Sequence, residues 1–81
     1  MDNAAEISAQ VSEIMSSILE RPIVNNDVLN MSMCAEWTSL KHIEIILSLE
    51  EYFQISFEIQ DIPKLTAKEL IVSKIEGMLH V

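Results

Sequence analysis

The sequence predicts an all-α fold: a small antiparallel bundle of three main helices and one short helix, with a long loop between the first and second helices. Apolar residues recur at three- and four-residue steps in three separate segments, which is the spacing of one helical face. The only glycine is Gly77, so no tight-turn glycine could close a strand hairpin, the competing interpretation of the loop. With 81 residues, the chain is expected to form a single domain, 1–81.

The first helix is expected from about Asn3 to Leu19. Ser12 is placed among the residues that lie away from its buried face, and Pro22 ends the helix because the residue before a proline is pushed out of the α region. The apolar residues expected on the buried face are Ile7, Val11, Ile14, Met15 and Ile18. Between Arg21 and Thr38 no helical pattern persists, and 25–27 is rich in turn-forming residues. An ordered connection of this length is uncommon in a small domain and is usually functional.

The second helix is expected to begin at Ser39 and to end near Tyr52 or Phe53. Its inward stripe is expected to consist of Leu40, Ile43, Ile46, Leu47 and Phe53, with Ile45 and Leu49 widening the apolar face. The opposite side is polar and mainly acidic, and it carries Lys41, Glu44, Ser48 and Glu51 beside Glu50.

Two further helical segments complete the predicted bundle. A short one is expected at about Ile59 to Ile62, closed by Pro63. The last helix opens with Thr66 as N-cap, with Glu69 at the spacing of a capping box. Its buried face is expected to comprise Ile71, Val72, Ile75, Met78 and Leu79.

Composition narrows the function. Five basic and thirteen acidic residues give a formal charge of −8, which repels nucleic acids and anionic lipids and attracts basic protein surfaces. No apolar run approaches the ~18 residues that span a bilayer. The acidic amino terminus is unlike a secretory signal, and Cys34 is the only cysteine, so a cytoplasmic monomer without internal disulfides is expected. So short a chain favours a carrier or interaction module over a complete enzyme.

Ser39 is the main candidate for a functional residue. It follows the long connection, so it is expected to be exposed, and its place at a helix start puts free backbone N–H groups and the positive end of the helix dipole beside it. A phosphodiester on its hydroxyl would lie in a favourable field. The alternative is that Ser39 serves only as a helix N-cap, a role in which serine is common.

The pattern Trp-x-Ser-Leu-x-x-Ile-Glu from Trp37, followed by Leu-x-x-Glu-Glu-x-Phe from Leu47, resembles the acyl and peptidyl carrier protein family. The resemblance covers essentially the whole chain. It implies that Ser39 carries phosphopantetheine, attached by a phosphopantetheinyl transferase. The terminal thiol of this arm would hold an acyl, aminoacyl or polyketide group as a thioester and present it to the enzymes of a biosynthetic pathway. The chain itself would catalyse nothing.

The resemblance also implies roles for residues of the second helix. Leu40, Glu44, Glu50 and Glu51 would bind partner enzymes. These enzymes load or transfer acyl or aminoacyl groups, and their basic patches would contact the four residues. The core, or a shelter for an acyl chain, would be formed by Ile43, Ile46 and Leu47. Thr38 stands where most members have aspartate, Lys41 stands at an often acidic position, and Trp37 matches a variant of specialised carriers. These three residues point to a dedicated partner set rather than bulk fatty-acid synthesis.

Other interpretations remain open. The chain could be an unmodified acidic interaction module that keeps the carrier fold, and a small enzyme using Ser39 and His42 ranks third. We expect His42 to be solvated on the helix surface and Cys34 to be a structural thiol rather than a metal ligand. Met31 and Met33 are expected to cover the bundle, and Trp37 either packs the loop onto the first helix or anchors a partner.

Overall fold

The computed structural model describes residues 3–23 and 29–79, and over these ranges the chain forms helices and no strand, as predicted. The elements are α1 (Asn3–Leu19), the 3-10 turn η1 (Met31–Met33), α2 (Ser39–Phe53), the 3-10 turn η2 (Ile62–Lys64) and α3 (Lys68–Leu79). The predicted bounds of the first two main helices are confirmed. The turn-rich residues 25–27 lie outside the described ranges.

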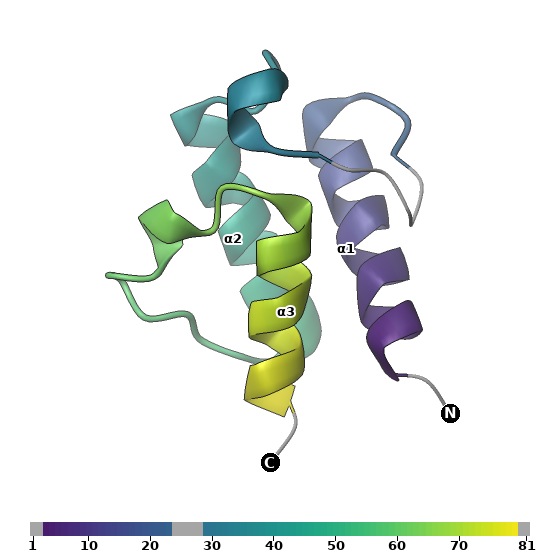
Figure 1. Cartoon of the computed structure of the whole chain (residues 1–81), viewed down its shortest axis with the longest axis vertical. Coiled ribbons are helices and arrows are strands. Elements are labelled where there is room, and N and C mark those ends of the chain that lie inside the picture. The colour runs from purple at the N-terminus through teal and green to yellow at the C-terminus, as the bar shows by residue number, and fades with distance from the viewer. Residues whose placement is uncertain (1–2, 24–28, 80–81) are drawn as a thin grey trace.

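α1 is the helix around which the bundle is built. It packs against both α2 and α3. Figure 1 shows that it runs opposite to the other two, and that the connection 54–67 returns the chain from the end of α2 to the opposite end of the bundle, where α3 begins. α1 is therefore antiparallel to α2 and α3.

The buried side of α1 is wider than one stripe. Four of its residues are core residues (Ile7, Val11, Met15 and Leu19), with Ile14 and Ile18 packed against them. Ser12 is also buried, at 2% exposure, so the prediction that it lies away from the core was wrong. The reason is that a helix packed between two neighbours buries a broader arc than a helix that covers one. Over the described residues, the Ser12 hydroxyl has no hydrogen-bond partner.

α1 ends through a left-handed residue rather than at the proline itself. Glu20 has φ 56°, the Arg21 N–H donates to the Ser16 carbonyl over 3.3 Å, and the Ser16 hydroxyl donates to the Arg21 carbonyl over 2.7 Å. A residue in this conformation directly after the last turn is a common helix C-terminus. Pro22 follows two residues later, so the predicted end of the helix before it is confirmed.

The apolar residues of α2 are divided between the core and the surface in a way the sequence analysis did not predict. Ile45, Ile46 and Leu49 are buried. Three residues of the expected inward stripe are exposed instead: Leu40 at 71%, Ile43 at 46% and Leu47 at 59%. The prediction was therefore right for Ile46 and wrong for those three. α2 is apolar on two sides, and the side that contains Ile45 and Leu49 faces inward.

The described end of the connection between α1 and α2, residues 29–38, is joined to the start of α3. The Met31 N–H donates to the Thr66 carbonyl over 2.7 Å, and the Lys68 N–H donates to the Leu29 carbonyl over 2.9 Å, forming one antiparallel bridge between Asn30 and Ala67. Cys34 and Trp37 are buried in the core. Cys34 is therefore the buried thiol that was predicted, and of the two roles considered for Trp37 its burial favours packing over the anchoring of a partner. Met31 packs against the core whereas Met33 is exposed.

The predictions for the second half of the chain need two corrections at helix ends. Pro63 is part of η2 rather than its end, because the first turn of a helix tolerates proline. Thr66 is not the N-cap of α3. Ala67 directly precedes the helix, and its carbonyl accepts the Ile71 N–H over 3.1 Å.

The interior and surface of α3 also differ in part from the prediction. Ile71 and Ile75 are buried, and Val72 and Met78 pack against the core, whereas Leu79 is exposed at the end of the helix. The segment before η2 is tied to this helix by an ion pair of 3.0 Å between Lys74 and Asp61. Of the helices described, none is long and apolar enough to cross a membrane.

Candidate functional site

Ser39 is the first residue of α2, and its neighbour Thr38 provides the N-cap. Thr38 has extended backbone angles (φ −83°, ψ 172°), its hydroxyl oxygen accepts the Lys41 N–H over 3.3 Å, and its carbonyl accepts the His42 N–H over 2.8 Å. The alternative in which Ser39 is the N-cap is therefore wrong. Ser39 is exposed. Its hydroxyl is thus presented at the helix start without being needed to cap it.

The surroundings of Ser39 favour a negative group. The backbone N–H groups of the first turn of a helix lack carbonyl partners within the helix and carry partial positive charge. The first turn of α2 contains no acidic residue. Lys41, two residues on, has its ammonium 3.7 Å from the Glu44 carboxylate. A phosphate on Ser39 would meet the N–H groups of this turn that the Thr38 cap leaves free, and Glu44, the acidic partner of Lys41, lies more than one turn further along the helix.

His42 differs most from its prediction. It is buried, at 5% exposure, rather than solvated. The Trp37 indole N–H donates to its Nδ1 over 3.0 Å, and its Nε2 lies 2.8 Å from the Ile62 carbonyl oxygen. The rings of His42 and Trp37 also lie close, with centroids 5.7 Å apart. With both nitrogens engaged, His42 is not placed to take a proton from Ser39, so the pairing suggested for a small enzyme is not formed.

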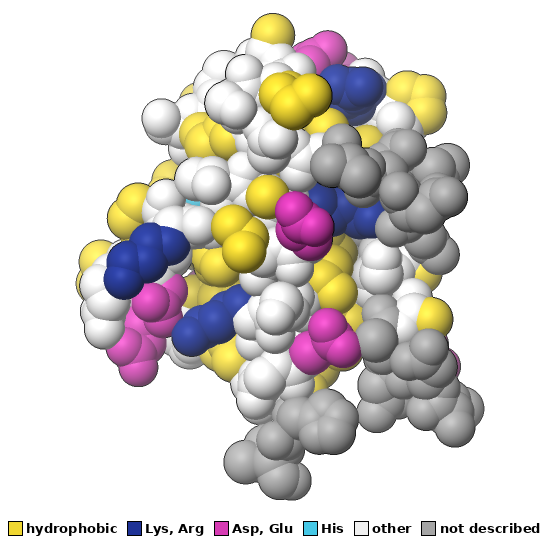
Figure 2. All heavy atoms as spheres, viewed as in Figure 1, with side chains coloured by type: hydrophobic (Ala, Val, Ile, Leu, Met, Phe, Trp, Pro, Cys, Tyr) yellow, Lys and Arg dark blue, Asp and Glu magenta, His cyan; other side chains and the backbone are white. Residues whose placement is uncertain are grey.

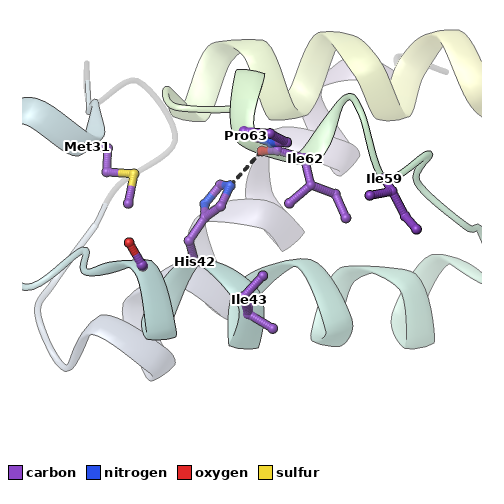
Figure 3. Close-up of a pocket in the computed structure, with 7 residues that line it drawn as sticks. Met31, His42, Ile43, Ile59, Ile62 and Pro63 are labelled. Atoms are coloured by element: carbon purple, nitrogen blue, oxygen red, sulfur yellow. Dashed lines mark hydrogen bonds between the residues drawn. The ribbon is translucent and has the colours of Figure 1, made fainter.

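An open pocket of about 530 Å³ lies beside Ser39. This volume is in the range of small-molecule sites. Figure 3 shows His42 projecting from α2 toward Ile62 and Pro63, with Met31 on one side and Ile59 on the other. Apart from Ser39 and His42 the lining is apolar: Met31, Ile43, Ile59, Ile62 and Pro63. Of the residues assigned to the core or an acyl shelter, Ile43 lines the pocket, Ile46 is in the core, and Leu47 is exposed.

The exposed side of α2 combines apolar and acidic groups. Leu40, Ile43 and Leu47 follow one another at three- and four-residue steps, and Glu44 and Glu51 continue the same side of the helix. We call these five residues the α2 surface stripe. It begins directly after Ser39. Such a patch of apolar side chains flanked by charge is typical of protein interaction sites.

Glu50 does not belong to this stripe. It is half-buried, and its carboxylate accepts the Phe57 N–H over 2.8 Å. Its backbone carbonyl accepts the Ile55 N–H over 3.1 Å and the cap N–H of Gln54, which has left-handed φ and ψ. The structure therefore gives Glu50 a role in holding the chain as it leaves α2, which differs from the docking role implied by the resemblance.

Arg21 and Glu36 form a charged pair around Cys34, near the end of the α1–α2 connection. The Cys34 thiol is 3.4 Å from the Glu36 carboxylate, and one Arg21 nitrogen lies 3.5 Å from the Cys34 sulfur and 3.6 Å from that carboxylate. A hydrogen bond from the Glu36 backbone N–H, followed by the Cys34 thiol and the Arg21 charge, lowers the pKa of Glu36 despite some desolvation. Among the described residues, no three His, Cys, Asp or Glu side chains gather closely enough to hold a metal ion.

The hydrogen-bonded chain Trp37–His42–Ile62 was not predicted from the sequence, and neither was the pocket wall formed by Ile59, Ile62 and Pro63. Trp37 and His42 are five residues apart across a helix start, which gave some reason to pair them. No pattern identifies the Ile62 carbonyl as the second partner, because it is a backbone group twenty residues away.

The face of the molecule seen in Figure 2 carries both basic and acidic side chains, interspersed among exposed apolar ones.

No model of a known protein family matches the chain, and no curated protein matches it significantly.

Proposed function

We propose that this protein is a carrier, in which Ser39 is modified with phosphopantetheine and the chain presents the group attached to that arm to partner enzymes. The observation that carries the proposal is the position of Ser39: exposed at the first turn of α2, relieved of capping by Thr38, and placed between an apolar pocket and the α2 surface stripe. The resemblance of the Ser39 motif to acyl and peptidyl carriers supports the same function. A specialised biosynthetic pathway fits best, since Thr38, Lys41 and Trp37 depart together from the commonest pattern.

The residues around Ser39 fit a phosphopantetheine group. The hydroxyl is accessible for phosphoester formation, and the first-turn N–H groups of α2 that the Thr38 cap leaves free would donate hydrogen bonds to the phosphate oxygens. When bound, the arm supplies a thiol that holds the carried acyl group as a thioester. The chain's own contribution is to keep that group near each docked partner at a high effective concentration.

Partner enzymes would recognise the α2 surface stripe. Leu40 and Leu47 offer apolar anchors, and Glu44 and Glu51 offer charges that complement a basic docking patch. The proposed partners are a phosphopantetheinyl transferase and the enzymes that load and transfer the acyl or aminoacyl group. Between Arg21 and Lys64, the only basic residue is Lys41, so this part of the chain keeps a strongly acidic balance toward such partners.

The direct test is the intact mass of the protein after incubation with coenzyme A and a broad-specificity phosphopantetheinyl transferase. We expect the wild type to gain the mass of one phosphopantetheine and Ser39→Ala to gain none. Ser56→Ala is the matched control, because Ser56 is an exposed serine outside α2, and it should be modified like the wild type. Modification of Ser39→Ala would show that the attachment site is elsewhere.

The second candidate is an unmodified interaction module, and Thr38 is the observation that favours it. Its side chain caps the helix but carries no charge, so it cannot replace the aspartate that most carriers place before the serine. Aspartate caps helices as well as threonine, so Thr38→Asp should leave the fold intact. If only Thr38→Asp is modified, the natural chain lacks a competent site for generic transferases. If neither protein is modified by any of several transferases, the interaction module is the better description.

A further inference from the structure

Met33 is the most exposed of the methionines that the structure describes. The residue lies in η1 and is 75% exposed. Met15 is buried in the core, and Met31 and Met78 are half-buried and pack against it. A peroxide oxidises a thioether where it can reach the sulfur. Of these residues, Met33 is therefore the one that an oxidant in solution meets first.

The Met33 sulfur is held by the side chain of Asn30, the residue that caps η1. The Asn30 Oδ1 accepts the Met33 backbone N–H over 3.1 Å and the Ser32 hydroxyl over 2.6 Å. Because a backbone N–H can only donate, this atom is the amide oxygen, and the atom that lies 3.1 Å from the Met33 sulfur is the amide nitrogen. Asn30 therefore donates an N–H to a thioether, which is a weak hydrogen-bond acceptor.

Oxidation of Met33 would give the Asn30 amide a stronger acceptor. A lone pair of the sulfur attacks one oxygen of a hydroperoxide, the O–O bond breaks, and a sulfur–oxygen bond forms. The sulfur loses two electrons and the peroxide gains them. With hydrogen peroxide, the other oxygen takes up the proton of the transferred oxygen and leaves as water. The product is methionine sulfoxide, which is polar, and the unbranched side chain can rotate to bring its oxygen to the amide N–H that faces the sulfur.

The oxidised side chain would carry no cost of burial. In the core, as at Met15, a sulfoxide would lose its hydration and destabilise the fold. At Met33 the sulfoxide stays in water, so the stronger hydrogen bond is the main change. The backbone of Asn30 is fixed independently of Met33 by its bridge to Ala67, so the amide is already in place before oxidation.

We propose that Met33 is a reversible oxidation site, at which a hydroperoxide forms a sulfoxide that the Asn30 amide then binds. The modification replaces an exposed apolar group by a polar one in the connection that leads to Ser39, and it stabilises the fold instead of disrupting it. The proposal does not depend on the carrier function, because each step involves only η1 and Asn30.

Limited treatment with hydrogen peroxide, followed by tandem mass spectrometry of peptides, tests the site. We expect the first oxygen among Met15, Met31, Met33 and Met78 to appear on Met33. Met31 is the internal control, because it lies in the same turn but is half-buried. Met33→Leu should remove this early oxidation and leave the slower oxidation of the other residues unchanged. Oxidation of Met31 as fast as that of Met33 would overturn the assignment.

Asn30→Asp is the matched variant that tests the role of the amide. Aspartate keeps an oxygen for the Met33 N–H and the Ser32 hydroxyl and caps helices well, but it has no N–H to donate. Tm is measured for each protein before oxidation and again on chains purified with a single oxygen on Met33. We expect oxidation to raise the Tm of the wild type by about 2 to 4 °C. In Asn30→Asp, where a carboxylate would face the sulfoxide, oxidation should leave the Tm unchanged or lower it. Equal shifts in the two proteins, or a lower Tm in the oxidised wild type, would refute a sulfoxide held by Asn30.

Reversibility is tested with the two methionine sulfoxide reductases, each of which reduces one epimer of the sulfoxide. With a dithiol as reductant, the sulfoxide oxygen leaves as water, the dithiol becomes a disulfide, and the thioether returns. We expect the two enzymes together to restore the original mass and Tm, because Met33 is exposed to them. A sulfoxide on Met33 that neither enzyme reduces would mean that the oxidation is permanent damage, and it would overturn the proposal.

Discussion

Replacing Ser12 by alanine should stabilise the protein. Ser12 is buried in the middle of α1, and over the described residues its hydroxyl has no hydrogen-bond partner. A buried hydroxyl without a partner costs about 1 to 3 kcal/mol of desolvation. In addition, alanine favours the interior of a helix over serine by about 0.5 kcal/mol. The void left by one oxygen atom offsets less than about 1 kcal/mol of this gain.

The net expectation is an increase of about 1.5 kcal/mol in the free energy of unfolding. For a domain of this size, that corresponds to a rise of about 6 to 12 °C in Tm. Urea and thermal unfolding followed by circular dichroism at 222 nm measure both quantities. An unchanged urea m-value would show that the effect lies in stability and not in the compactness of either state.

Ser17→Ala is the matched control for this substitution. Ser17 is on the same helix but exposed, so its replacement gains the helix preference of about 0.5 kcal/mol and nothing from desolvation. The reasoning is refuted if Ser12→Ala is no more stable than Ser17→Ala. That result would mean that the Ser12 hydroxyl is satisfied in solution, for example by a buried water molecule.

Three further predictions concern other parts of the chain. Glu20→Gly should stabilise by up to about 1 kcal/mol in urea unfolding, because residue 20 has φ 56° and glycine adopts this conformation without a Cβ penalty; no gain would argue against the left-handed end of α1. The pKa of Glu36 is lowered from 4.5 in the folded state, so its contribution to stability is complete above pH 4.5 and is lost as the pH falls through the folded-state pKa. In Glu36→Gln, the midpoint of urea unfolding should therefore change less with pH below 4.5 than it does in the wild type. Identical pH profiles for the two proteins would contradict this. Ile45→Ala should cost about 2 to 5 kcal/mol and Leu47→Ala less than about 0.5 kcal/mol, and similar losses would show that the buried side of α2 is wrongly assigned.

The helices were predictable where local signals agree. α1 ends before Pro22, and α2 begins where the long connection meets a run of apolar residues, so both sets of bounds follow from short-range chemistry. The short segment before α3 was less predictable. Ala67 is drawn into a bridge with Asn30, and this long-range backbone contact delays the start of α3 beyond Thr66.

The orientation of α2 could not be predicted in the same way. Leu40, Ile43 and Leu47 have the spacing of a buried stripe, and so does the set that is buried. Periodicity identifies an apolar side but cannot choose between two of them. The choice depends on which parts of the chain pack against α2. His42, on the buried side of α2, is held by the Trp37 side chain and by the backbone carbonyl of Ile62 in η2. The spacing of Trp37 and His42 gives a weak local signal for the first contact, whereas the contact with the Ile62 carbonyl has no signature in the local sequence.

The residues that were wrongly assigned in α2 are informative about function. Exposing Leu40, Ile43 and Leu47 forgoes the burial of three large apolar side chains, each of which could contribute about 1.5 to 3 kcal/mol in a core. A short chain has little stability to spare, and local rules tend to fail at functional sites. All three residues lie on the same side of α2, starting next to Ser39, and Ile43 also lines the pocket. The residues for which periodicity gave the wrong side of α2 therefore lie next to the proposed attachment site. This is expected if the outer side of α2 is kept apolar in order to bind partners and cargo.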